Sequence, residues 1–463
     1  MSRTRQSGIG RSRLRLLPLL LTAGILASPA FPARAQANPG PKSPVLSSCV
    51  KKVNAAHPLH DDGKSVPPDR LQALSKGVNL TDVFVPSMST ARVSQDIAQL
   101  RSLGLRHARI PLDPSWVISW RPDGKPDARL ARLDDTVCSA LSSGLAVILD
   151  MHPEDSLALK DTAPPDNVDA LALAWDRLAT RYAAFTPDLM FFEALNEPTF
   201  SNAARWDRAQ QVLLAHIREA APHHTILLTA TPDSTAGALA GLAPVDDADV
   251  AYVFHFYSPM VFTHQGADWA SHDLGSIRGL VYPAEPGNAG AVRDRAAVAD
   301  EKPLANYLAS YANAHAIQAE IDVATRWAAS HDAHLVVTEF GVYRAVAPQA
   351  ARVAWLRDVR KALEARSIGW TVWEYRGGFG IDGELSRGCG SEQSASSALG
   401  LCGPGKTRAG GEGGSMRANL GMATLPTWPG TARADRRAAG CAASLKGLRV
   451  SSASGPARFA VRT

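Results

Sequence analysis

The chain has 463 residues, of which 45% are hydrophobic and 20% are charged, a composition that is ordinary for a globular protein and excludes wholesale disorder. The net charge of +5 is unevenly distributed: residues 1–37 hold six arginines and no acidic residue, residues 387–463 carry +8, and residues 38–386 carry −9. An acidic body argues against nucleic acid as a partner and suits a neutral ligand.

The first 37 residues have the layout of a secretory signal peptide. Five arginines precede the apolar run Leu16–Ala27, and Ala35-Gln36-Ala37 supplies a cleavage-type triplet. The apolar run is too short to cross the roughly 30 Å of a bilayer's hydrocarbon core. We therefore expect export, cleavage after Ala37, a secreted or periplasmic location, and no membrane association after cleavage.

Residues 38–69 begin with a Pro/Ser-rich stretch and are interpreted as an N-terminal linker or extension, and residues 70–388 alternate between strand-like and helix-like segments. The strand-like segments are short and apolar, as in parallel strands buried on both faces. They are Lys76–Leu80, Arg106–Leu112, Ala146–Met151, Met190–Leu195, Thr225–Thr231, Val250–Phe256, Leu335–Phe340 and Gly369–Trp373. The amphipathic segments are Ser94–Leu103, Leu130–Ser143, Asp169–Phe185, Ala203–Ala220, Ile321–Ser330 and Ala350–Ala365.

Eight strands with intervening helices predict an α/β fold, a closed (β/α)8 TIM barrel. An open doubly wound sheet is the rival, but no Gly-rich phosphate loop follows the first strand. Residues 259–320 form a long insertion after the sixth strand, with Trp269, Tyr282, Tyr307 and Tyr311. A loop of this length is usually functional, so we assign it to the ligand cleft, with a structural subdomain as the alternative.

Residues 389–463 are a basic, low-complexity tail that we expect to be largely disordered. Trp428 is its only tryptophan, which argues against a carbohydrate-binding module. A short helix around Ser394–Leu401 is one way in which the barrel could close before the tail.

The five cysteines are Cys49, Cys138, Cys389, Cys402 and Cys441, and none has metal-ligand spacing. Export permits disulfides, but the odd count leaves at least one cysteine unpaired. The pairing stays open, with Cys389–Cys402 as one possible short bridge.

Side chains that do chemistry in such a barrel stand at the C-terminal ends of the strands, where the βα loops form the active face. Glu197 and Glu339 end two very apolar strands, where a carboxyl group costs free energy unless it is used or paired. Strands 4 and 7 lie on opposite sides of an eight-membered ring, so we expect the two carboxylates to face each other across its mouth. The other candidates at strand ends are Asn79, Asp82, Arg109, Asp150, His152, Asn196, His255, Tyr257, Trp373 and Glu374.

Facing carboxylates are typical of glycosidic bond cleavage, in which one group protonates the leaving oxygen while the other attacks the anomeric carbon or activates water. Carboxyl groups about 5–5.5 Å apart give retention of configuration, and a separation of roughly 6.5–9.5 Å gives inversion. The sequence alone leaves this distance open.

The ordered set of motifs resembles glycoside hydrolase family 5, the cellulase family, in the clan of retaining (β/α)8 glycosidases. The matching strings, between about Gly77 and Gly380, are Ala-Arg-Ile-Pro, Asp-Met-His, Leu-Asn-Glu-Pro, His-Phe-Tyr, Thr-Glu-Phe-Gly and Trp-Glu-Tyr. Any one string is weak, but eight positions in order and on the expected strands are specific. The resemblance implies that Glu197 is the general acid/base, with a raised pKa, and that Glu339 is the nucleophile.

The resemblance also implies six supporting positions. Arg109 and Tyr257 would hold Glu339, and His255 would contact the acid/base or the sugar. The sugar itself would be bound through its 2-hydroxyl by Asn196, through a hydroxyl beside the scissile bond by His152, and from below by Trp373. We interpret Asp82, Asp150, Glu193 and Glu374 as structural, and leave Trp116, Trp120 and Trp269 open between sugar platforms and core packing.

The implied function is a secreted endo-β-1,4-glucanase that acts by double displacement on a β-linked polysaccharide, as a monomer and without a cofactor or metal. Mannan, β-1,3-glucan and a bacterial exopolysaccharide are alternative substrates, because subsite loops set the choice. The 259–320 insertion departs from compact cellulases of the family and puts cellulose itself in doubt. An inactive sugar-binding barrel is the alternative from another class, although both carboxylates are present; a metallohydrolase would need a His-x-His pair on the first strand, which is missing.

Overall fold

The computed structural model describes residues 44–58, 65–119, 127–154, 156–270, 272–285, 301–309, 312–385 and 394–401. The chain divides into two compact units, residues 1–410 and 411–463, and every described residue belongs to the first. The predicted signal peptide, nearly all of the predicted tail, and Cys389 and Cys402, whose pairing was left open, lie outside the described residues. Among the described helices, none combines the length and apolar character needed to cross a membrane.

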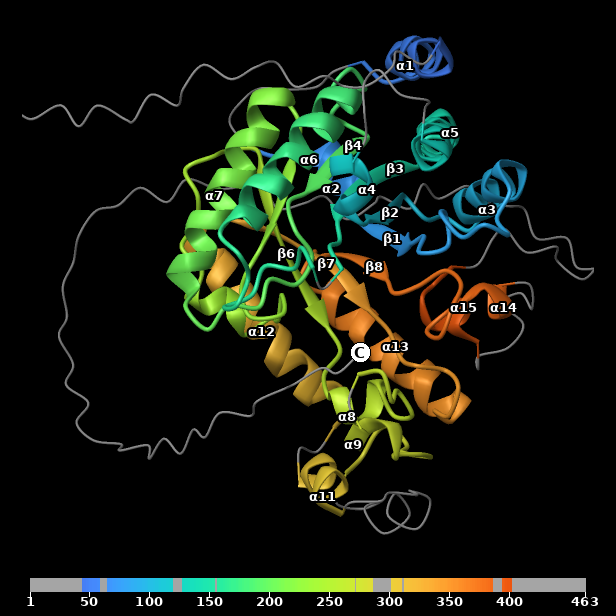
Figure 1. Cartoon of the computed structure of the whole chain (residues 1–463). Helices are drawn as coiled ribbons and strands as arrows, with labels where there is room; N and C mark the ends of the chain where they lie inside the picture. The colour runs from blue at the N-terminus through green and yellow to red at the C-terminus, as the bar shows by residue number, and fades with distance from the viewer. Residues whose placement is uncertain are drawn as a thin grey trace, which may run out of the picture. The chain divides into compact units, whose positions relative to one another are not determined.

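Eight parallel strands close into a barrel whose spatial order equals the chain order, with β8 pairing back onto β1 (Figure 1). This confirms the predicted (β/α)8 fold. The strands are β1 (Lys76–Asn79), β2 (His107–Leu112), β3 (Ala146–Met151), β4 (Met190–Glu193), β5 (Ile226–Thr229), β6 (Val250–Phe256), β7 (His334–Phe340) and β8 (Gly369–Val372).

The strands are buried on both faces because side chains fill the barrel interior and helices cover its outside. All residues of β3 and β6 are buried, which explains their continuous apolar runs. The pairing of β6 with β7 shifts register between Phe254 and His255, and that of β7 with β8 shifts between Val337 and Phe340. Such irregularities re-aim side chains next to active sites, and these two lie where His255 and Glu339 leave the barrel wall.

The six helices predicted from amphipathic patterns are all present. They are α3 (Thr90–Ser102), α5 (Ala128–Ser142), α6 (Asp166–Tyr182), α7 (Ala203–Ala220), α12 (Ala314–His331) and α13 (Gln349–Glu364). Four begin at a side-chain cap that accepts a hydrogen bond from a backbone N–H group of the first turn: Ser89, Asp127, Asn202 and Asn313. Shorter elements are α2 (Pro68–Ala73), α4 (Pro114–Ser119), η1 (Ala238–Gly241), α8 (Met260–Thr263), α9 (His272–Gly275), α11 (Glu301–Ala309), α14 (Asp382–Leu385) and α15 (Ala395–Ala398).

Part of the predicted N-terminal linker is a helix, α1 (Pro44–Ala56), which packs against α5 (Figure 1). Its buried face includes Leu46 and Val53. A disulfide between Cys49 and Cys138 joins the two helices across 89 residues of sequence. This answers, for the described residues, the pairing that the sequence left open.

The 259–320 insertion has two parts with different roles. Tyr282 and Tyr307 are buried, and Tyr307 packs flat against Phe262 with ring centroids 6.2 Å apart, so this part is a structural subdomain around α8 and α11. Met260 and Trp269, by contrast, are exposed, and both line the pocket described below. Tyr311 lies outside the described residues.

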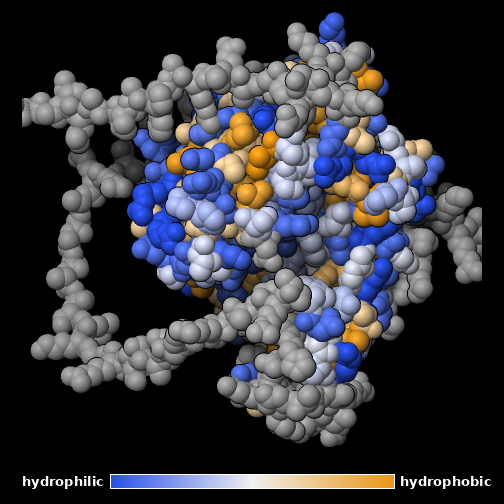
Figure 2. All heavy atoms as spheres, viewed as in Figure 1, coloured by the Kyte–Doolittle hydropathy of each residue, from blue (hydrophilic) through white to orange (hydrophobic). Residues whose placement is uncertain are grey.

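Among the described residues after β8, the helices are the short α14 and α15, and no long eighth helix is found there. The second was expected from the sequence near Ser394–Leu401; it packs on α13 and buries Leu399 and Leu401. On the face seen in Figure 2, hydrophilic residues predominate and hydrophobic ones are interspersed among them.

Candidate active site

A pocket of about 550 Å³ lies over the C-terminal ends of the strands. Its lining combines the predicted acidic and aromatic residues of β3, β4, β6, β7 and β8 with residues of the insertion. The lining residues are His152, Asn196, Glu197, Asp233, Thr235, His255, Tyr257, Ser258, Met260, His264, Trp269, Ala270, Glu320, Glu339, Trp373 and Phe379.

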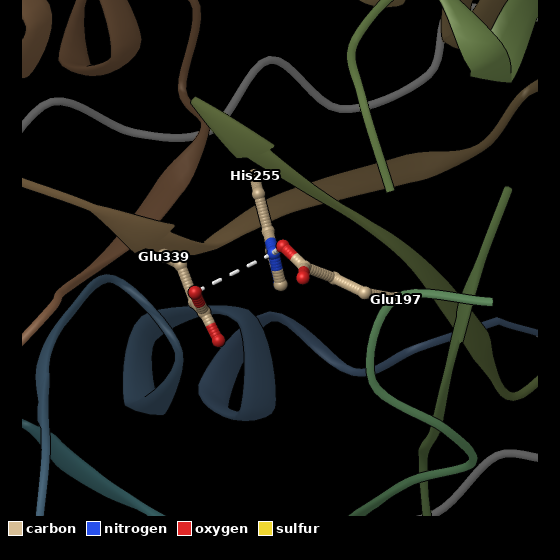
Figure 3. A group of neighbouring side chains, drawn as sticks. All are labelled: Glu197, His255 and Glu339. Atoms are coloured by element: carbon tan, nitrogen blue, oxygen red, sulfur yellow. Dashed lines mark hydrogen bonds and ion pairs between the residues drawn. The ribbon is translucent and has the colours of Figure 1, made fainter. Parts of the chain in front are cut away.

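Two carboxylates face each other in this pocket (Figure 3). One oxygen of Glu197, one oxygen of Glu339 and one ring nitrogen of His255 all lie within 4.8 Å of one another. The side chain of Glu197 is 41% exposed, whereas that of Glu339 is 6% exposed. One carboxylate is therefore open to a ligand, and the other is held in the barrel wall.

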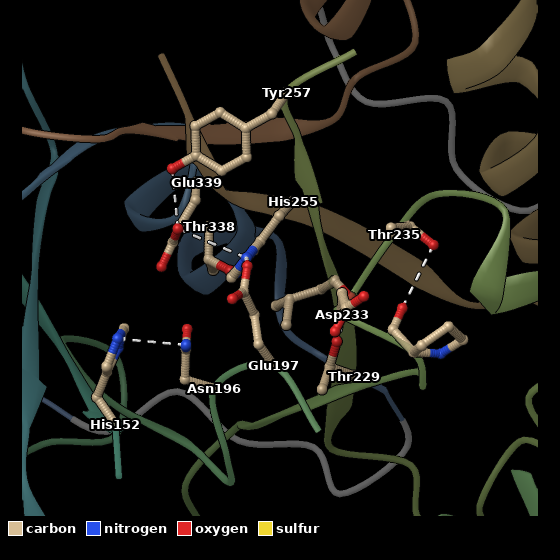
Figure 4. Close-up of polar contacts among 12 residues, drawn as sticks. His152, Asn196, Glu197, Thr229, Asp233, Thr235, His255, Tyr257, Thr338 and Glu339 are labelled. Atoms are coloured by element: carbon tan, nitrogen blue, oxygen red, sulfur yellow. Dashed lines mark hydrogen bonds and ion pairs between the residues drawn. The ribbon is translucent and has the colours of Figure 1, made fainter. Parts of the chain in front are cut away.

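Two donors hold Glu339 in place. Nη1 of Arg109 donates to one oxygen at 2.8 Å, and the hydroxyl of Tyr257 donates to the other at 2.9 Å (Figure 4). Burial and the nearby charge of Glu339 raise the pKa of Tyr257 well above its ordinary value, so the phenol keeps its proton and remains a donor. Both oxygens of the carboxylate are thus oriented before any substrate arrives.

Arg109 is fully buried and serves several acceptors at once. Besides Glu339, its guanidinium contacts Asp150 at 2.9 Å and binds both oxygens of Glu193 at 2.7 and 3.0 Å. Burial alone would lower the pKa of Arg109, but the three carboxylates outweigh it and raise the pKa well above its ordinary value. Asp150 and Glu193, which the sequence analysis interpreted as structural, are therefore supports of the site.

A second chain of contacts runs from Asp150 to the floor of the pocket. Asp150 accepts a hydrogen bond from Nδ1 of His152 at 2.9 Å, and Nε2 of His152 lies 3.3 Å from the amide nitrogen of Asn196. The His152 ring stacks on Trp373 at 17° between planes. Burial works to lower the pKa of His152, but the hydrogen bond and charge of Asp150, together with the charge of Glu339, outweigh it and raise the pKa above its ordinary value.

Glu197 and His255 form a close pair, with Nδ1 of His255 2.8 Å from a Glu197 oxygen. Burial works to raise the pKa of Glu197, but the hydrogen bond and positive charge of His255 outweigh it, so that the pKa lies below its ordinary value. Burial works to lower the pKa of His255, and the charges of Glu339 and Glu197 raise it instead. In this geometry the pair holds its proton on the imidazole, contrary to the raised Glu197 pKa expected from the sequence.

The spacing of Glu197, His255 and Glu339 would also allow a metal ion. Their hydrogen bonds favour another arrangement, because both Glu339 oxygens already accept bonds from Arg109 and Tyr257 and one Glu197 oxygen faces Nδ1 of His255. That no metal is required stays a prediction.

The structure brings all eight predicted site residues together: seven line the pocket, and Arg109 lies beneath it in contact with Glu339. Of the tryptophans left open, Trp269 lines the pocket, and Trp116 is buried against Phe84. Trp120 lies outside the described residues.

Two polar residues left as structural, Asp82 and Glu374, bind Arg376 and Thr81 respectively.

The sequence analysis missed several lining residues, of which Asp233 and Glu320 are acidic. Asp233 comes two residues after the expected end of strand 5, the kind of position from which the other candidates were drawn. The criterion of polar residues at strand ends could therefore have identified Asp233 from the sequence. Glu320 carried no comparable signal, because it lies on helix α12.

Comparison with known proteins points in the same direction. The model of the family described as Cellulase (glycosyl hydrolase family 5) matches residues 71–378. Endoglucanase 3 of Fibrobacter succinogenes is 27% identical over 375 residues, which cover 75% of this chain and 56% of that relative. The chain thus spans little more than half the length of that protein. Endoglucanase C of Acetivibrio thermocellus is 26% identical over 295 residues, covering 61% of this chain and 83% of the relative.

Solved structures share the fold. One, described as an endoglucanase, has a TM-score of 0.54 and 25% identity and covers 68% of this chain and 93% of its own. The endoglucanase Cel5A of Thermotoga maritima has a TM-score of 0.57 and 24% identity, covering 72% of this chain and 98% of its own.

Proposed function

The chain belongs to glycosyl hydrolase family 5, and we propose that it is an exported, retaining endo-β-1,4-glucanase in which Glu339 is the nucleophile and Glu197 the acid/base. One observation carries the proposal: oxygens of the two carboxylates lie within 4.8 Å of each other across the pocket. This spacing suits direct attack on the anomeric carbon, since an inverting enzyme needs carboxyl groups roughly 6.5–9.5 Å apart to admit a water molecule.

In the first half-reaction, Glu339 attacks the anomeric carbon while Glu197 protonates the departing glycosidic oxygen. The bond from carbon to the leaving oxygen breaks, and a glycosyl ester forms on Glu339. The assignment of roles follows from exposure: Glu197 is open to the pocket, and Glu339 is fixed by Arg109 and Tyr257. The proton reaches Glu197 from His255 across 2.8 Å.

In the second half-reaction, Glu197 removes a proton from water, and the water oxygen attacks the anomeric carbon. The ester bond breaks, Glu339 is released as a carboxylate, and the sugar leaves with its original configuration. Asn196 and His152 are placed to bond hydroxyls of the sugar, and Trp373 supplies an apolar surface on the same side of the pocket.

Two observations support a neutral glucan as substrate. Among the described residues that line the pocket there is no lysine or arginine, so the lining offers no permanently charged cation to an anionic sugar. Several curated relatives carry the names endoglucanase or cellodextrinase, although two relatives are named as probable glucan 1,3-beta-glucosidases. One solved neighbour has been crystallised with mannotriose, so mannan belongs in any substrate test.

The Cys49–Cys138 disulfide supports export, because disulfides persist in oxidising compartments and are rare in the cytosol. We also propose that the protein acts as a monomer, because all eight residues assigned to the reaction belong to one barrel.

Hydrolysis of barley β-glucan, hydroxyethyl cellulose, mannan, β-1,3-glucan and a bacterial exopolysaccharide would test the proposal, with the products followed by proton NMR. We expect the fastest cleavage on β-1,4-linked glucan and first-formed products in the β configuration. Glu339→Gln and Glu197→Gln should each lose at least about a thousandfold in turnover. First-formed α products, or full turnover in Glu339→Gln, would contradict the mechanism, and preference for another polymer would change the substrate alone.

A further inference from the structure

The segment from Thr231 to Thr235, which follows β5, is tied to the strands that carry the acid/base pair. The backbone N–H of Asp233 donates to the carbonyl of Pro198 at 3.0 Å, directly after Glu197. On the other side, the backbone N–H of His255 donates to the carbonyl of Ser234 at 2.7 Å. The segment is therefore hydrogen-bonded through its backbone to the residue after Glu197 on one side and to His255 on the other.

The backbone of this region is unusual. Five non-glycine residues of the described chain have positive φ, and two of them, Asp332 and Ser367, follow helices α12 and α13. The other three lie at the pocket: Glu197 at 38°, Asp233 at 55° and Ser234 at 52°. A left-handed backbone is unfavourable for residues with a Cβ atom, and it persists mainly where the structure over-determines it, as at functional sites.

The side chain of Asp233 is held from one side and lines the pocket from the other. Thr199 donates its hydroxyl proton to Oδ1 of Asp233 at 2.9 Å, and Asp233 is also one of the residues that line the pocket. Within the described residues, no arginine or lysine forms an ion pair with Asp233. Burial raises the pKa of Asp233, and the charge of Glu197 raises it further. Its other oxygen, Oδ2, accepts no hydrogen bond from a described residue.

The position of Asp233 relative to Glu197 indicates which of the two sugars at the scissile bond Asp233 would contact. Glu197 must protonate the leaving oxygen, so the departing sugar lies on its side of the scissile bond. His152 and Trp373 lie near Asn196 and the nucleophile, where the sugar that becomes attached to Glu339 must sit. Asp233 belongs to the loop after β5, next to the segment that follows Glu197, and is therefore on the departing side.

We propose that Asp233 is a specificity-determining residue that binds a hydroxyl of the departing sugar and disfavours an anionic sugar at that place. Its carboxylate would accept the hydroxyl proton in a charge-assisted hydrogen bond while Thr199 keeps the side chain in position. Glu320 also lines the pocket, and within the described lining there is no lysine or arginine to neutralise these carboxylates. The inference rests on the proposed function, because it needs a leaving group that is a sugar.

The test compares two leaving groups in the wild type, Asp233→Asn and Asp246→Asn. Asp246 is exposed in the loop before β6, at the opposite end of the barrel strands, so its variant removes the same charge away from the pocket. One substrate is the tetrasaccharide of the polymer that is cleaved fastest; the other is an aryl glycoside, whose leaving group is not a sugar. Thermal unfolding checks that both variants fold.

We expect Asp233→Asn to lower kcat/KM on the tetrasaccharide by about tenfold or more, as for a hydrogen bond to a charged group, and to lower it several-fold less on the aryl glycoside. The ratio of rates on carboxymethyl cellulose and hydroxyethyl cellulose should rise at least threefold in this variant alone. Equal losses on both substrates, or no loss on either, would overturn the role of Asp233 while leaving the proposed function intact. A wild type inactive on every substrate would overturn both.

Discussion

Replacement of Tyr257 by phenylalanine is the sharpest test of how the nucleophile is held. The substitution keeps the ring and its edge-to-face contacts with His264 and Phe379, and removes only the hydroxyl that donates to Glu339 at 2.9 Å. The remaining donor near that oxygen is Nδ1 of His255, at 3.5 Å. The carboxylate is then free to rotate toward the imidazole and away from the anomeric carbon.

The size of the effect follows from the bond that is lost. A hydrogen bond to a charged group contributes about 1.5–3 kcal/mol, which corresponds to a loss of about ten- to hundredfold in rate. The loss should fall on kcat rather than KM, because Tyr257 contacts the nucleophile and not a binding hydroxyl. Since the pKa of Tyr257 is raised well above its ordinary value, the ratio of wild-type to variant kcat should stay flat between about pH 5 and pH 9.

Steady-state kinetics on a soluble β-glucan oligosaccharide measures these parameters. Tyr343→Phe is the matched control: Tyr343 packs beside Phe379 and Trp269, and within the described residues its hydroxyl has no hydrogen-bond partner. A loss below threefold in Tyr257→Phe, or an equal loss in Tyr343→Phe, would refute the reasoning.

Three further predictions concern stability. Glu193→Gln should lower the free energy of unfolding in urea by about 3 kcal/mol, because it removes one charged partner of the fully buried Arg109. Replacing Cys49 and Cys138 by serine should cost about 2–4 kcal/mol in thermal unfolding, since the disulfide closes a long loop, and should leave turnover at 25 °C unchanged. Burial lowers the pKa of His107 from 6.5 to about 4, so the neutral imidazole contributes fully to stability above pH 6.5. This contribution is lost as pH falls toward 4, which lowers the free energy of unfolding by about 3 kcal/mol. In His107→Gln the free energy of unfolding should not show this dependence on pH.

Each of these has a simple counter-result. Glu193→Gln should be compared with Glu219→Gln, an exposed glutamate on α7, and equal stability of the two would contradict the buried pair. An unfolding temperature of the wild type that does not change when a reducing agent is added would contradict the role of the disulfide. For His107, the same stability loss from pH 6.5 to 4 in wild type and variant would show that another group titrates.

The barrel could be predicted because its signals are local. Strands β3 and β6 were predicted with the bounds they have, since each is a continuous apolar run that ends at turn residues. The expected strand 4 ran to Leu195, but β4 ends at Glu193, because the chain leaves the ladder there and turns Asn196 and Glu197 into the pocket.

Features that depend on contacts between residues far apart in the sequence could not be predicted in the same way. Helix α1 begins within a Pro/Ser-rich stretch, and its stability comes from packing on α5 and from a cysteine 89 residues away. Asp150 and Glu193 were interpreted as structural because their shared partner, Arg109, lies on another strand, and only the closed ring brings the three together. The positions next to each strand end were predictable; the charge network beneath them was not.

The way Arg109 is shared has a consequence for the second half of the proposed cycle. When Glu339 becomes an ester, it loses its negative charge. If Glu339 were the one counter-ion of the Arg109 guanidinium, the guanidinium would then be free to move. Asp150 and Glu193 keep the guanidinium where it was, at 2.9 and 2.7 Å. The ester is thus met by the same donor as the free carboxylate, and the barrel is already arranged for water to arrive as soon as the first product has gone.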